Sequence, residues 1–129
     1  MKTGTLVSIL IIVLAVLIIT SSCATTPKTK EEREVVQPEV FFQSVRSGNY
    51  SEVKRLIKKG ADVNTRDEYE LRALMLASHM GHTEIVKLLI EAGADINATD
   101  NIRHTALWWA YQYGNTEVTE LLREAGAKE

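Results

Sequence analysis

The sequence lacks the residue patterns on which most protein chemistry depends. Its single cysteine, Cys23, excludes an intramolecular disulfide. Its three histidines, His79, His82 and His104, show no metal-ligand spacing with a third donor. Glycine-rich phosphate loops and nucleophile-elbow motifs are missing as well. We therefore expect no metal, no cofactor, no catalytic residues and no enzymatic activity.

A strong excess of positive charge is also missing. The 129 residues hold 15 Lys and Arg against 17 Asp and Glu, a net charge of −2. Without residues 1–22, in which Lys2 is the only charge, the remaining 107 residues have a net charge of −3. This balance does not indicate nucleic-acid binding.

The first 22 residues resemble a secretory signal peptide. Lys2 supplies a positive start, and the fourteen residues 6–19 that follow are apolar apart from Ser8. This stretch is shorter than the roughly 20 apolar residues that a helix needs to span a bilayer. We expect residues 1–22 to be a signal peptide, while an uncleaved N-terminal anchor stays open as the alternative.

Cys23 follows the small residues Ser21 and Ser22, and this stretch resembles the lipobox of bacterial lipoproteins. Thr20 departs from the leucine that is usual three places before the cysteine. The resemblance implies that Cys23 is lipidated and becomes the first residue of the mature chain. Two or three acyl chains on one residue would hold a small protein stably on a membrane. Ala24, where lipoproteins retained in the inner membrane often have Asp, favours the outer membrane of a bacterial envelope, facing the periplasm or the cell surface.

Residues 23–38 would then comprise the lipidated cysteine and a disordered tether. They are polar, charged and poor in large apolar side chains, a composition typical of flexible linkers. The fold is left to residues 39–129.

One short sequence motif recurs within residues 39–129 at intervals of 33 positions. Gly-Ala-Asp-Val-Asn at 60–64 returns as Gly-Ala-Asp-Ile-Asn at 93–97 and, shortened, as Gly-Ala at 126–127. Gly48, Gly81 and Gly114 keep the same step. This period indicates a stack of similar units, none of which can bury its apolar face alone. Such a stack offers an extended surface and no deep pocket, so we expect a protein as the binding partner and no small-molecule substrate.

The middle copy shows the structure of one unit. Polar residues 67–70 predict a turn, and residues 73–80 predict a short helix that ends at Gly81. Residues 83–92 predict a second helix, because Ile85, Val86, Leu88 and Leu89 share one face.

A turn, two helices and an extended exit in 33 residues resemble the ankyrin repeat. Residues 81–97 follow the family consensus almost throughout, and the resemblance covers residues 39–129. It implies an all-α ankyrin-repeat solenoid of three helix-turn-helix repeats, at about 39–66, 67–99 and 100–129. It also implies a non-catalytic protein-binding scaffold.

The chain departs from the family pattern in its turns and at its end. Glu70 and Arg103 replace the turn glycine, at a position that often needs a positive φ. Thr119 and Arg123 stand where the earlier copies have apolar residues, which indicates that nothing stacks beyond the third repeat.

Ankyrin stacks usually bind through their turn tips and inner helices, which together form a concave face. Carried over position by position, the resemblance implies partner-binding roles for Arg46, Arg66, Glu68, Tyr69, Leu71, His79, Met80, Asn101, Ile102, His104, Gln112 and Tyr113. Tyr69, Tyr113, Arg46 and Arg66 are the preferred anchors, because aromatic residues and arginine dominate interface energetics.

The tryptophans at 108 and 109 point about 100° apart on a helix, so they cannot share one face. We expect Trp109 to pack in the core and Trp108 to seal the end of the stack. Two further functions stay open besides general protein binding. One is an immunity or inhibitor protein for an envelope-acting toxin or enzyme, and the other is a lipid-tethered spacer.

Overall fold

The computed structural model describes residues 36–129, which fold into six helices and no strand. The expectations for the signal peptide, Cys23 and most of the tether fall on residues 1–35 and lie outside the described residues. The helices are α2 Pro38–Arg46, α3 Tyr50–Lys58, α4 Ala73–Met80, α5 Thr83–Glu91, α6 Ala106–Gln112 and α7 Thr116–Glu124. None of these helices is long and apolar enough to cross a membrane.

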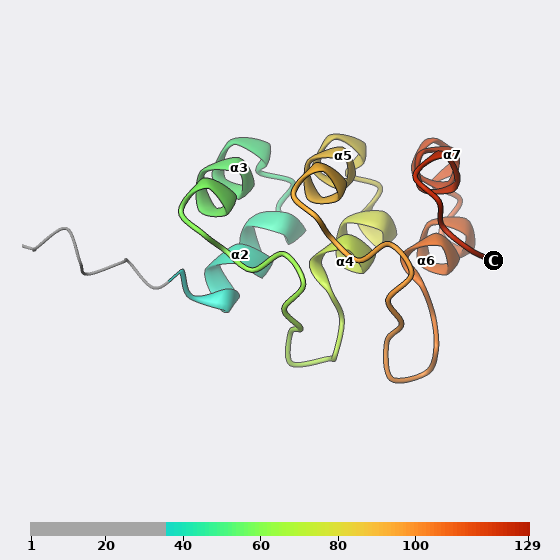
Figure 1. Cartoon of the computed structure of the whole chain (residues 1–129), viewed down its shortest axis with the longest axis horizontal. Helices are drawn as coiled ribbons and strands as arrows, with labels where there is room; N and C mark the ends of the chain where they lie inside the picture. The colour runs from blue at the N-terminus through green and yellow to red at the C-terminus, as the bar shows by residue number, and fades with distance from the viewer. Residues whose placement is uncertain (1–35) are drawn as a thin grey trace, which may run out of the picture. The chain divides into compact units, whose positions relative to one another are not determined.

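The helices form three pairs that lie side by side (Figure 1). The inner helices α2, α4 and α6 make one layer, and the outer helices α3, α5 and α7 make the other. Each inner helix contacts the next inner helix, and each outer helix contacts the next outer helix. The predicted all-α solenoid of three repeats is therefore confirmed.

Short local signals set where the helices begin and end. Pro38 opens α2, where its missing N–H has no partner to lose. The Asn49 side chain caps α3 by accepting the Glu52 N–H at 3.1 Å. Gly81 ends α4 in the left-handed conformation, with a φ of 73°, as its position predicted.

The core runs along the stack between the two layers. In the middle repeat, Ile85, Val86 and Leu89 are 2%, 0% and 0% exposed, as their shared face predicted. Residues 33 positions away, such as Leu56 and Leu122, are buried in the same way. Each such side chain contributes about 1.5–3 kcal/mol of burial free energy. Residues 36–129 form one compact unit with this core of their own.

Side-chain amides tie each repeat to the next. Asn115 donates to the Ser78 carbonyl at 2.7 Å, at the end of the preceding inner helix. Asn64 accepts the Asp95 N–H at 2.8 Å, and Asn97 makes the equivalent bond one repeat later. These bonds satisfy backbone groups that would otherwise lack partners at the helix and loop ends.

The C-terminal end of the stack differs in part from the expectation. Arg123 is exposed and pairs with Glu129 at 3.0 Å, as a solvent-facing end requires. Thr119 is only 7% exposed, however, because it still lies against its own repeat. Its hydroxyl donates to the Asn115 carbonyl at 2.9 Å, so its polarity is satisfied locally.

Candidate binding face

Two long loops, residues 59–72 and 92–105, join each outer helix to the next inner helix and project past the inner layer (Figure 1). We call them finger 1 and finger 2. In finger 1 the Asp67 Oδ1 accepts the N–H groups of Tyr69 and Leu71, both at 2.9 Å. In finger 2 the Asp100 Oδ1 accepts the N–H groups of Ile102 and His104 at 3.0 and 2.8 Å. One carboxylate therefore shapes each fingertip.

The fingertips contain the two non-glycine residues with positive φ in the described part of the chain. These are Glu70, at 61°, and Arg103, at 67°. The sequence predicted this conformation from the missing glycines. Glu70 also pairs with Arg66 at 2.7 Å, which links the two sides of finger 1.

The second oxygen of each aspartate attaches its finger to an inner helix. Asp67 pairs with Arg46 of α2 at 3.1 Å, with only 5% of the aspartate side chain exposed. Asp100 accepts the Trp109 Nε1–H of α6 at 3.3 Å. Finger 1 is thereby attached to α2, and finger 2 is attached to α6.

We define the concave face as the twelve predicted partner-binding residues together with the surface between them. Four of them are apolar or amphipathic side chains that reach solvent: Tyr69 and Ile102 are each 62% exposed, Met80 is 46% exposed and Tyr113 is 54% exposed. Glu68, Asn101 and Gln112 are also exposed. Leu71 differs, because it is half-buried and packs against the core.

Ring contacts, one of them between repeats, hold Tyr113 in place. The His79 ring of α4 meets the Tyr113 ring edge-on, with 4.1 Å between centroids. Trp109 stacks beside Tyr113 at 6.0 Å. In finger 2, His104 stacks flat on Trp108 at 3.4 Å. An exposed aromatic side chain that is already ordered loses little conformational entropy when it binds a partner.

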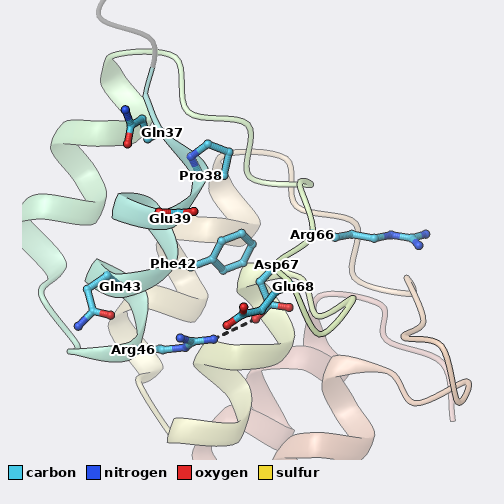
Figure 2. Close-up of a pocket in the computed structure, with 9 residues that line it drawn as sticks. All are labelled: Gln37, Pro38, Glu39, Phe42, Gln43, Arg46, Arg66, Asp67 and Glu68. Carbon is cyan, nitrogen blue, oxygen red and sulfur yellow. Dashed lines mark hydrogen bonds and ion pairs between the residues drawn. The ribbon is translucent and has the colours of Figure 1, made fainter.

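The face is hollowed at its N-terminal end, between α2 and finger 1 (Figure 2). The hollow measures about 750 Å³. It is lined by Gln37, Pro38, Glu39, Phe42, Gln43, Arg46, Arg66, Asp67 and Glu68. Phe42, at 4% exposure, lies between the helix and the finger, whereas the Arg66 side chain points away from the other lining residues (Figure 2). The hollow is open and mixed in polarity, so it suits a side chain of a partner better than an enclosed substrate.

The comparison with known families rests on the same part of the chain. A family model for ankyrin repeats, in three copies, matches residues 41–129. The chain belongs to the ankyrin repeat family. Ankyrin repeats are protein–protein interaction modules, and the chain is such a module. No curated protein was found to resemble it in sequence.

The predicted partner-binding residues lie on the fingers, on the inner helices or at the C-terminal cap of α6, whereas the two tryptophans differ in burial. Trp109 is half-buried against the core, as predicted. Trp108 is 37% exposed at the C-terminal end of the stack. There it lines a second hollow of about 620 Å³, together with Thr99, Arg103, Thr105, Leu107, Tyr111, Arg123 and Glu129.

Sequence reasoning missed the residues that attach the fingers to the inner helices or line the first hollow. Asp67 was predicted only as part of a turn, and Asp100, Phe42 and Glu39 were not assigned to the concave face. The spacing of 33 between the two aspartates was the available signal. Among residues 36–129, no group of three His, Cys, Asp or Glu side chains is placed to hold a metal ion.

Proposed function

We propose that this ankyrin stack binds another protein through its concave face and carries out no reaction. The observation that supports this most is the exposure of Tyr69 and Ile102 on the fingertips and of Met80 and Tyr113 at the C-terminal ends of the inner helices α4 and α6. Apolar and aromatic side chains of this kind act as interface anchors when a partner covers them. The neighbouring hollow beside Arg46 offers room for a side chain of that partner.

We further propose that the stack is presented in a bacterial envelope by a lipid at Cys23, most simply at the outer membrane. The support comes from the sequence alone: an apolar stretch of fourteen residues, two small residues and then the only cysteine. A tether after the lipid would leave the concave face accessible to partners.

The binding proposal can be tested by capture of partners on residues 36–129, which have a core of their own. Tyr113→Ala is expected to lower capture at least about fivefold, since truncating a central aromatic anchor commonly costs more than about 1 kcal/mol. Adding Tyr69→Ala is expected to lower it further. Capture is measured by quantitative mass spectrometry of envelope extracts.

Tyr111→Ala is the matched control, because Tyr111 is 73% exposed on the same inner helix but faces the end of the stack. Equal losses for Tyr113→Ala and Tyr111→Ala would count against the concave face. Recovery of one partner at a one-to-one ratio that blocks a toxin or enzyme would favour the immunity or inhibitor function.

A further inference from the structure

The three outer helices carry charges of opposite sign. Residues 50–60, which contain α3, have a net charge of +3, whereas residues 83–93 have −1 and residues 116–126 have −2. Because the three segments occupy equivalent places in their repeats, the fold does not require this difference. The positive charge is a property of the first repeat.

Equivalent solvent-facing positions show the change most directly. Lys58 stands where α5 has Glu91 and α7 has Glu124, each one repeat apart. Lys54 stands where α7 has Glu120. All five side chains are exposed. At the Lys58 position glutamate keeps both α5 and α7 soluble, and at the Lys54 position it does so in α7, whereas α5 has Lys87 there. Solubility alone therefore does not explain both lysines of α3.

The surface around these lysines is basic and has one aromatic member. We call Tyr50, Lys54, Arg55, Lys58 and Lys59 the basic face; all five are exposed. Tyr50, Lys54 and Lys58 are spaced by four residues and lie in one row along α3. The Lys54 Nζ lies 5.6 Å from the centroid of the Tyr50 ring.

The acidic residue of α3, Glu52, already has a positively charged partner. Glu52 accepts the Nε–H of Arg55 at 2.9 Å. This hydrogen bond and the charge of Arg55 hold the pKa of the Glu52 carboxyl below its usual value, so it stays ionised and paired. It therefore adds no separate negative site beside the lysines.

We propose that the basic face docks on a membrane surface that contains anionic lipids. Lysine and arginine near such a surface are each attracted to it, and tyrosine favours the headgroup region through its amphipathic ring. Charge effects fall off within about 10 Å at ordinary salt. The acidic outer helices α5 and α7 would be repelled by the anionic lipids once they came within this distance of the membrane. Docking would therefore orient the stack with its first repeat on the membrane.

The position of the basic face favours a membrane over a nucleic acid. The chain enters the compact unit at Val36, in the same repeat as α3. Even fully extended, the residues between Cys23 and Val36 reach at most about 45 Å. If the proposed lipid at Cys23 is correct, Val36 at the start of the first repeat stays within that distance of the bilayer surface. Residues 36–129 as a whole have a net charge of −3, which disfavours a nucleic acid that would pass over several repeats.

The test uses residues 36–129 without the tether, so its result does not depend on Cys23. Sedimentation with vesicles of phosphatidylglycerol and phosphatidylcholine measures the partition coefficient at about 50 mM salt, where surface charges are weakly screened. Each basic side chain near the surface is worth about a fivefold change in partitioning. Lys54→Gln with Lys58→Gln is therefore expected to lower binding about 30-fold. Binding should disappear at high salt and on pure phosphatidylcholine.

Lys87→Gln with Lys128→Gln is the matched control, since it removes the same charge from exposed positions outside the basic face. It is expected to change binding less than about threefold, within the effect of one surface charge. An equal loss in both double variants would overturn the proposal, because net charge alone would then explain binding. Absence of binding to anionic vesicles, or tighter binding to an RNA or DNA oligonucleotide at the same salt, would also overturn it.

Discussion

At the scale of single residues, Glu70 and Arg103 hold a backbone conformation that their side chains disfavour. Their φ angles of 61° and 67° lie in the left-handed region, where a Cβ crowds the following carbonyl. The sequence alone predicted both positions, because glycine is usual there in ankyrin repeats. Strain of this kind persists only when surrounding contacts determine the conformation.

Replacing Arg103 with glycine is expected to stabilise the protein. The substitution removes the Cβ strain, although it also frees the unfolded chain, so the net gain in the free energy of unfolding should be about 0.5–1 kcal/mol. Urea titration followed by circular dichroism measures the gain. Arg103→Ala keeps the Cβ and should bring no such gain. If alanine stabilises as much as glycine, the explanation by backbone strain is wrong.

At the scale of elements, each finger depends on one buried carboxylate. Asp100 is 8% exposed and accepts three hydrogen bonds, two from its own fingertip and one from Trp109. Asp67 makes the corresponding contacts in finger 1: its carboxylate accepts two N–H groups of the fingertip and pairs with Arg46. The fingers are therefore ordered parts of the concave face and not loose connections.

Asp100→Ala is expected to lower the free energy of unfolding by about 2–3 kcal/mol, because it leaves three partly buried N–H groups without an acceptor. Asp95→Ala serves as the control, since Asp95 is exposed and its carboxylate accepts only the Asn97 N–H, at 3.1 Å. The control should cost less than about 1 kcal/mol. Urea titration compares the two variants, and equal costs would show that Asp100 does not shape finger 2 as described.

Whether the sequence predicts a feature of the concave face depends on whether the feature follows from the repeating pattern or from a contact between different repeats. The helices, the finger positions and the exposure of Tyr69 and Ile102 follow from a pattern that repeats along the chain. The contact between His79 and Tyr113 does not, because it joins two repeats through side-chain orientation. Leu71 was expected on the concave face because of its position in the turn. The sequence did not show that its side chain packs against the core.

At the scale of the whole molecule, the fold was predictable because nearly all contacts between its helices lie within one repeat or between neighbouring repeats. A stack of this kind needs no distant pairing in the sequence, so a period of 33 is enough to give its architecture. The proposed membrane anchor is a separate question. It rests on Cys23, whose surroundings in the sequence resemble a lipoprotein signal.

The whole-molecule prediction is that the chain carries a lipid and that Cys23 holds it. Wild type grown with a labelled fatty acid should incorporate the label, and Cys23→Ala should lose nearly all of it, since no other cysteine exists in the sequence. Ser22→Ala is the matched control, because it keeps both a small residue and the cysteine. If wild type stays in the membrane fraction without any label, the apolar stretch before Cys23 is an uncleaved anchor instead. Equal labelling of wild type and Cys23→Ala would exclude this cysteine as the site of attachment.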